Sequence, residues 1–210
     1  MSNNLPTRPI FVVIEGLPGC RTTEVATAVA ARFTGPVYRP AWNCPWSFMP
    51  EIRRAMDREC EAQPQAAMLL KALMTLTIKG SLEAELQEGH LVVLDRYWLS
   101  AVVPHSILGA ADHLEGIMRQ ILKTDVTYYL HAPLAIRSAR VEQMRRDDAA
   151  AVRWTLEPSH DAKLDAGYRA RERYPIVGDF VALDATQPIE ILVDQVIADI
   201  LARQPPNWRR

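Results

Sequence analysis

Two short segments of the sequence carry residues whose types and spacing suit phosphate chemistry. The first reads IEGLPGCRTTEVA, in which two glycines, one basic residue and two threonines stand between an apolar run and a helical pattern. In loops of this kind, backbone N–H groups and a helix N-terminus surround an anion, a cation neutralises the phosphates, and a hydroxyl holds magnesium. The candidate phosphate-binding residues are Gly16, Gly19, Arg21, Thr22 and Thr23.

This loop fits the phosphate-binding pattern G-x-x-x-x-G-K-S/T imperfectly, in either of two registers. Counted from Gly16 without a gap, Arg21 takes the second glycine position, Thr22 the lysine position and Thr23 the hydroxyl position. With one position deleted, Arg21 takes the lysine position and Thr22 the hydroxyl position. Both registers lack lysine, and an arginine is a wide planar group where lysine is a compact point charge. Both stay open, and a plain glycine-rich turn with a threonine N-cap is the alternative without phosphate binding.

The second segment reads LVVLDRYWLSAV and begins at Leu91. An acid at the carboxyl end of a buried strand can hold a metal ion or its waters, and an adjacent arginine can grip a phosphate with two N–H groups. Asp95 and Arg96 are therefore candidates for contacts with a metal ion and a phosphate. For an isolated Asp-Arg pair, a surface ion pair or a helix cap is the alternative.

Short apolar runs alternate with longer helical patterns along the chain, and these elements must position both segments. The runs are residues 10–14, 37–38, 91–94, 126–130 and 180–183, and the helical patterns are residues 22–33, 65–87, 111–122, 134–146, 161–173 and 189–201. Runs that are hydrophobic on both faces are typical of strands in a parallel sheet. The sequence predicts a doubly wound α/β fold with a mainly parallel five-stranded sheet between helices in three layers. Ligands of such sheets bind beyond the carboxyl ends of the strands.

Composition limits the class of protein. The chain has 210 residues, of which 49% are hydrophobic and 23% charged, and its net charge is −1, which together predict one soluble domain over residues 1–210. No global basic field favours nucleic acid or an anionic membrane, and no run approaches the ~20 apolar residues of a membrane span. A signal peptide is not expected, because the first ten residues lack its charged-then-apolar order. A disulfide framework is not expected either, because the cysteines number three, and they lack metal-ligand spacing. We predict a reducing, cytoplasmic location.

The two segments together resemble the thymidylate kinase family, whose members carry I-E-G-x-x-G-x-G-K-S/T-T and, about eighty residues later, D-R-Y-x-x-S. The segment YYLHAP, which ends at Pro133, is similar to the family's Y-L-D-V-P strand end, and the similarity extends over roughly residues 9–201. The resemblance implies a P-loop kinase fold that transfers a phosphoryl group from ATP, with Mg²⁺, to a (deoxy)nucleoside monophosphate. Family members are commonly homodimers packed through helices, and residues 65–87 are a candidate for that helix.

By this resemblance we predict that Asp95, Arg96 and Arg21 are catalytic, and that Thr22 and Asp95 are the metal ligands. The resemblance also implies roles for residues outside the two segments. Arg39 falls where the family has an arginine that grips the monophosphate, and Arg145 and Arg146 fall in an arginine-bearing lid, which we expect around residues 137–157. An aromatic cluster beside Arg39 could line an acceptor pocket, although packing under an irregular loop is equally consistent with it. The candidate pocket residues are Trp42, Leu70, Met74, Tyr97, Ser100 and His105.

The departures from the family concern chemistry more than fold. Leu70 and Met74 stand near the positions of the aromatic residue and arginine that read the base, and His105 follows Pro104 where the family has Tyr-Gln. Three hypotheses therefore remain open. The first is a monophosphate kinase with an altered loop, and the second is a repurposed member that hydrolyses a nucleotide phosphate or a nucleotide-like intermediate without ATP. The third is a non-catalytic binding subunit.

Overall fold

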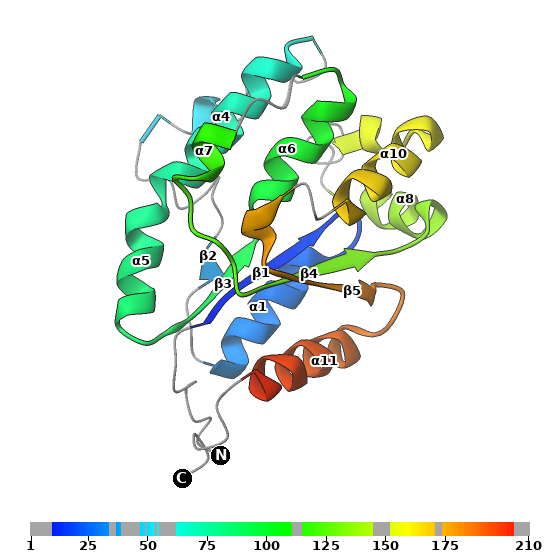
Figure 1. Cartoon of the computed structure of the whole chain (residues 1–210). Helices are drawn as coiled ribbons and strands as arrows, with labels where there is room; N and C mark the ends of the chain where they lie inside the picture. Colours follow the sequence, from blue (N-terminus) through cyan, green and yellow to red (C-terminus); the bar gives the residue numbers. More distant parts are fainter. Residues whose placement is uncertain are drawn as a thin grey trace.

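The structure is a computed structural model of the whole chain, and a parallel sheet forms its middle layer (Figure 1). It describes residues 10–33, 37–38, 47–48, 50–52, 54, 62–110, 115–144, 152–170 and 174–203. The strands are β1 (Ile10–Gly16), β2 (Val37–Tyr38), β3 (Leu91–Asp95), β4 (Val126–His131) and β5 (Asp179–Asp184). They lie in the order β2-β3-β1-β4-β5, and every neighbouring pair is parallel.

Four strands make up nearly all of the sheet. β2 has only two residues and pairs with Val93 and Leu94, whereas the other strands have five to seven. The central strand β1 is buried at every position, because its run of β-branched and aromatic side chains meets helices on both faces. The doubly wound, parallel α/β class predicted from the sequence is confirmed, with β2 contributing only this short pair.

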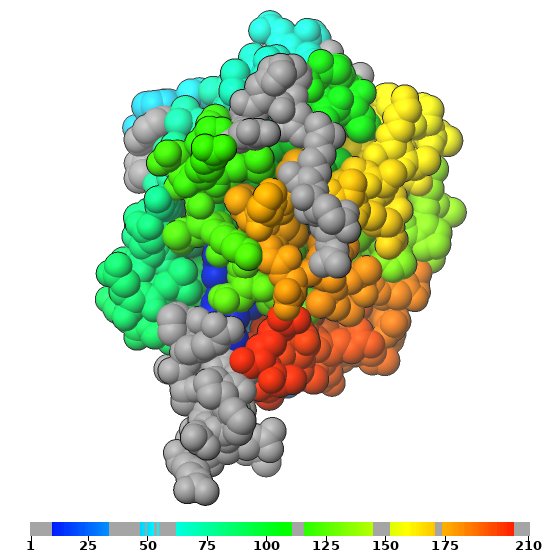
Figure 2. All heavy atoms as spheres, in the orientation of Figure 1, coloured from blue at the N-terminus to red at the C-terminus, as the bar shows by residue number. Residues whose placement is uncertain are grey.

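Helices cover both faces of the sheet. α1 (Thr22–Phe33) and α11 (Ile189–Ala202) pack on one face, and α4 (Pro64–Thr77), α5 (Lys79–Gln87), α6 (Trp98–Ile107) and α10 (Pro158–Arg169) form the layer on the other (Figure 1). The shorter elements are α7 (Glu115–Met118), α8 (Leu134–Glu142), η1 (Arg153–Leu156) and η3 (Pro175–Val177). In the same orientation, Figure 2 shows α11 directly beneath the segment that contains η3 and β5.

Three helical predictions need correction. The pattern over residues 65–87 is divided into α4 and α5 by a turn at Ile78, whose side chain is fully buried. The predicted helix 111–122 is reduced to the four residues of α7 within its described part. The helix α6 was not predicted from the sequence, for two reasons. Pro104 lies inside it, and its residues are apolar around most of the helix, so that no amphipathic pattern marks it.

The predicted lid segment, residues 137–157, lies only partly within the described residues. Its first residues belong to α8 and the following turn, and residues 153–156 form η1. A lid therefore stays a prediction. Within the part of the chain that the structure describes, no helix is both long and apolar enough to cross a membrane.

Candidate active site

The loop between β1 and α1 is held in shape by two glycines and one tight turn. The Cys20 N–H donates to the Leu17 carbonyl at 3.0 Å. Gly19 has a φ of +84°, and a Cβ there would lie 2.7 Å from the Arg137 carbonyl oxygen. A Cβ on Gly16 would lie 2.7 Å from the Leu130 carbonyl oxygen. Both positions therefore require glycine, because any side chain would collide with the backbone of β4 or α8.

The contact that distinguishes the two loop registers joins the hydroxyl of Thr23 to Asp95. Thr23 Oγ1 donates to Asp95 Oδ2 at 2.5 Å, whereas Thr22 is only 3% exposed. This geometry fits the register counted from Gly16 without a gap, in which Thr23 takes the hydroxyl position of the pattern. Thr22, predicted as a metal ligand, is instead buried at the lysine position of this register, and the hydroxyl beside Asp95 is that of Thr23.

Arg21 does not stand in for the missing lysine in this geometry. Its φ is +66°, which is the backbone conformation that the motif's second glycine adopts without strain. Its guanidinium contacts Glu24 in the first turn of α1, with Nη2 2.9 Å from the Glu24 carboxylate. The side chain of Arg21 thus forms a local ion pair, and this contact does not support its predicted catalytic role.

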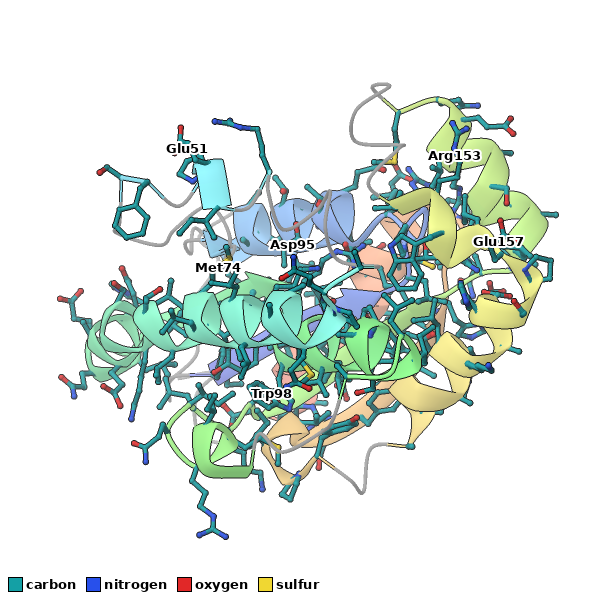
Figure 3. All side chains as sticks on the ribbon, turned by 90° about the horizontal axis from the view of Figure 1, so that it is seen from above. Glu51, Met74, Asp95, Trp98, Arg153 and Glu157 are labelled. Carbon is teal, nitrogen blue, oxygen red and sulfur yellow. The ribbon has the colours of Figure 1, made fainter. Side chains whose placement is uncertain are left out.

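Asp95 and Thr23 together form an oxygen-rich site suited to Mg²⁺. Asp95 ends β3, lies beside Ile14 in the sheet register and is 6% exposed. Carboxylate and hydroxyl oxygens are the donors that Mg²⁺ prefers, and the ion usually keeps several waters beside them. In Figure 3, Asp95 lies between Glu51 on one side of the view and Arg153 on the other. The residues present fit the metal that the family implies.

Arg96 fastens the beginning of the loop. Its backbone N–H donates to the Ile14 carbonyl at 3.0 Å, and its Nη1 donates to the Gly16 carbonyl at 2.8 Å. Arg96 also has a φ of +68°, a strained conformation for a non-glycine residue. The structure thus brings the two segments singled out in the sequence together at the carboxyl ends of β1 and β3.

Glu15 is a buried carboxyl group that joins β1 to α6. Its carboxylate accepts hydrogen bonds from the N–H groups of Tyr97 and Ser100 at 2.9 and 3.2 Å, and from Ser100 Oγ at 2.5 Å. Burial raises the pKa of Glu15, and these hydrogen bonds, together with Arg96, oppose that rise. The group caps the N-terminus of α6 from another element, which fixes the backbone directly after Arg96.

Two arginines of α8 reach the opposite side of the loop. Arg137 is fully buried and donates from Nη1 to the Pro18 carbonyl at 3.2 Å. Arg140 donates from Nη1 to the Gly19 carbonyl at 3.1 Å and from Nη2 to the Ala185 carbonyl at 3.0 Å. The sequence analysis missed Arg137 as a site residue. The available signal was its spacing of four residues from Val141, which places both side chains on the buried face of α8.

Comparison with known protein sequences finds thymidylate kinases. No protein-family model matches the chain. It is 26% identical over 200 residues to a probable thymidylate kinase of Staphylothermus marinus, covering 90% of this chain and 92% of the relative. It is 25% identical over 205 residues to the thymidylate kinase of Coprothermobacter proteolyticus, covering 91% of this chain and 98% of the relative. The chain therefore resembles thymidylate kinases in sequence over most of its length.

Solved structures agree with this fold. A deoxyadenosine kinase from M. mycoides with bound dATP has a TM-score of 0.66 at 10% identity, covering 91% of this chain and 100% of that chain. The same kinase with bound dCTP has a TM-score of 0.62 at 12% identity, covering 91% and 98% of the two chains. At such identities the likeness establishes the fold alone.

The thymidylate kinase-like chain fills the predicted base-stacking positions with an apolar cluster. Met74 is 1% exposed and packs with Ala67, and the partly buried Ile52, Leu70 and Trp154 pack against them. In Figure 3, Met74 and Asp95 lie on one side of α4 and Trp98 on the other. Met74 is therefore a core residue, and Trp154, on η1, was missed because nothing in the sequence places it beside α4.

Three other predicted pocket residues serve the interior of the protein. Tyr97 is 4% exposed, donates to the Leu122 carbonyl at 3.1 Å and packs edge-on against Phe11. Ser100 binds Glu15, as described above. His105 is 1% exposed, its Nδ1 lies 2.9 Å from the Ala101 carbonyl, and burial lowers its pKa to about 3. Tyr97 and His105 are therefore corrected from pocket residues to core residues.

A separate cavity of about 470 Å³ lies beside the loop, under α10. It is lined by Leu17, Tyr129, His131, Ala132, Pro133, Leu134, Asp161, Ala162, Asp165, Arg169, Asp184 and Thr186.

The predicted residues Arg39, Trp42, Arg145 and Arg146 lie outside the described residues, so their roles stay predictions.

Proposed function

We propose that this chain transfers the terminal phosphoryl group of ATP to a (deoxy)nucleoside monophosphate, with Mg²⁺. The contact between Thr23 Oγ1 and Asp95 Oδ2, at 2.5 Å, is the observation that carries the proposal. It joins the hydroxyl of a phosphate loop to the acid of the neighbouring strand, which is the pairing that P-loop phosphotransferases use for their metal. The names of the sequence relatives, which are thymidylate kinases, support the same reaction.

Each part of the site has a role in this proposal. Thr23 and Asp95 would hold Mg²⁺, which when bound neutralises charge on the transferred phosphate. The N–H groups of the loop and of the first turn of α1 would surround the donor phosphates. Arg96, fixed between Ile14 and Gly16, would present its remaining N–H groups to the phosphates. We keep Arg39, Arg145 and Arg146 as proposed phosphate ligands.

The acceptor side is proposed to recognise its ligand by apolar contact. The partly buried side chains of Leu70 and Trp154, which pack against the cluster of Ala67 and Met74, offer aliphatic and indole surfaces in place of the family's aromatic residue and arginine. A base bound there would gain stacking energy from Trp154, on the order of 1–3 kcal/mol. It would find no arginine on the described part of α4 to read its edge, so we propose weak discrimination among nucleobases.

We also propose that the chain forms a homodimer through α4. Leu69 and Leu73 lie one helical turn apart on this helix and are 43% and 37% exposed. Large apolar side chains at such spacing form a stripe that a second helix can cover.

A second candidate function is hydrolysis of a nucleotide phosphate without ATP. The observation that favours it is the loss of the loop cation, because Thr22 stands buried at the lysine position and Arg21 pairs with Glu24. A phosphate loop without this charge binds a triphosphate less strongly, while Asp95 and Arg96 remain available for a simpler phosphate ester.

A label-transfer assay separates these two functions. The protein is incubated with Mg²⁺, ATP labelled in its γ-phosphate and each of the common nucleoside monophosphates. Labelled nucleoside diphosphate in the wild type, abolished in D95N, supports the kinase. D194N, which changes an exposed aspartate of α11, is the matched control and should transfer label normally. Absence of labelled diphosphate with every acceptor would contradict the proposal.

A further inference from the structure

The phosphate loop is gripped through its carbonyl oxygens by three guanidinium groups. Arg96, Arg137 and Arg140 donate to the carbonyls of Gly16, Pro18 and Gly19, at 2.8, 3.2 and 3.1 Å. Arg96 follows β3, and the other two arginines stand one turn apart on α8. Three of the first four residues of the loop are thus anchored from outside it.

Arg137 is the most deeply placed of the three. Its side chain is 0% exposed, Nε donates to the Ala132 carbonyl at 3.2 Å, and Nη2 pairs with the Asp161 carboxylate of α10. The backbone of Arg137 also lies directly against Gly19, because a Cβ added to Gly19 would come within 2.8 Å of the Arg137 Cα. One guanidinium therefore joins the loop, α8 and α10.

These contacts place guanidinium groups against the carbonyl oxygens of a loop that has no lysine. A cation at a carbonyl oxygen polarises the whole peptide unit and makes the N–H of that unit a stronger donor. The Pro18 carbonyl belongs to the same unit as the Gly19 N–H, and the Gly16 carbonyl to the same unit as the Leu17 N–H. In a low-dielectric interior, this polarisation is little screened by water.

We propose that Arg137 is a positioning residue for phosphate binding: held by Asp161, it fixes and polarises the loop and so replaces part of the charge of the missing lysine. This rests on the proposed function only in taking the loop as the site of a donor phosphate chain. A purely structural role for the same buried ion pair would stabilise the fold without changing affinity for phosphate.

The test measures binding of inorganic tripolyphosphate and of Mg-ATP by calorimetry, in variants that remain folded by circular dichroism. R137M removes the guanidinium but keeps an unbranched side chain of similar length. R137K keeps the charge but not the fork of donors, and D161N keeps Arg137 but weakens its anchor. R32M is the matched control, since Arg32 forms a surface pair with Asp194 and its side chain is 58% exposed.

The proposal expects R137M to bind tripolyphosphate about tenfold or more weakly than the wild type, as for loss of a charge-assisted hydrogen bond. R137K should recover part of this loss, D161N should show a smaller loss, and R32M should bind as the wild type does. Where turnover is measurable, KM for the donor should rise more than kcat falls.

Several outcomes would overturn the proposal. These are wild-type affinity in folded R137M, a wild type that binds neither tripolyphosphate nor Mg-ATP, and loss of the fold in both R137M and D161N. If R137M alone fails to fold, unchanged affinity in D161N overturns it. Tripolyphosphate binding that depends on Arg137 in a protein without any kinase activity would contradict the proposed function and leave this inference standing.

Discussion

At the level of single residues, the side chain of Thr23 indicates how the loop between β1 and α1 aligns with the phosphate-binding pattern. The sequence allows two registers, and the contact of Thr23 with Asp95, together with the positive φ of Arg21, favours the one counted without a gap. In the resulting register, Arg21 sits at a glycine position with a φ of +66° and Thr22 sits buried at a lysine position. In this register the loop matches the phosphate-binding pattern in length and in the hydroxyl that we propose for the metal, and it differs at the two residues before that hydroxyl.

Replacing each threonine with valine tests this register directly. T23V should lower kcat by about a hundredfold or more, because it removes a group that contacts the metal only through its hydroxyl. T22V should change kcat by only a few fold, since valine matches the shape of a buried threonine. Steady-state kinetics at saturating Mg²⁺ measure both. A larger loss in T22V than in T23V would contradict the register counted without a gap.

Arg21 gives a prediction about stability. A non-glycine residue in the left-handed region costs on the order of 1 kcal/mol, and an exposed ion pair such as that with Glu24 returns only about 0–1 kcal/mol. R21G should therefore leave the free energy of unfolding unchanged or raise it by up to about 1 kcal/mol in urea titration. R21A keeps the strained backbone without the ion pair and should not be stabilised. Destabilisation in R21G would show that the side chain contributes more than its local pair.

At the level of elements, the layer formed by α4, α6 and α10 explains why predicted pocket residues became core residues. α6 begins directly after Arg96 and is capped at its N-terminus by Glu15. Its buried face presents Trp98, Val102 and His105 to the interior. The helix thus uses the family's base-contacting position for packing, which removes His105 from any role with substrate.

His105 makes stability depend on pH in a definite direction. Burial holds its pKa at about 3, whereas its ordinary value is 6.5. The unfolded chain therefore takes up a proton that the folded chain does not, so stability present above pH 6.5 is lost as pH falls toward 3. Unfolding measured from pH 7 to 4 should show that H105L becomes progressively more stable relative to the wild type, by up to about 1.4 kcal/mol per pH unit. A difference that is independent of pH would contradict the buried, neutral histidine.

The elements also show what the sequence could predict. Strands with continuous β-branched runs, such as β1 and β3, and the amphipathic α1 follow local patterns and were predicted closely. Pro104 hid α6, and the break at Ile78 was missed although Gly80 stands two residues after it. Arg137 was not predicted as a site residue, because its partners Pro18 and Asp161 lie 119 and 24 residues away in the chain. Such contacts depend on tertiary packing, which periodicity does not record.

At the level of the whole molecule, the sheet brings every described functional element to one edge. The carboxyl ends of β1 and β3 place the loop and Asp95 together, and β4 leads into α8, whose arginines hold the loop. The long stretch of chain between β1 and β3 supplies α4, with exposed leucines on its outer surface.

The proposed dimer gives a prediction at this scale. Sedimentation of the wild type should show a dimer, and L69D/L73D should convert it to a monomer, because two carboxylates would be buried in an apolar interface. Ile191 of α11 is also exposed, at 47%, so I191D is the matched control and should remain dimeric. A wild-type monomer at micromolar concentration, or a dimer unaffected by L69D/L73D, would contradict an interface at α4.

The most direct test of phosphotransfer at the Thr23–Asp95 site is product identification with and without the donor. Purified protein is incubated with a panel of nucleoside monophosphates and Mg²⁺, in the presence and absence of ATP, and the products are separated by chromatography. We predict a nucleoside diphosphate that forms only with ATP and disappears in T23V and D95N. Free nucleoside or base formed without ATP would contradict the kinase and establish a hydrolase, and no product in either arm would indicate a binding protein.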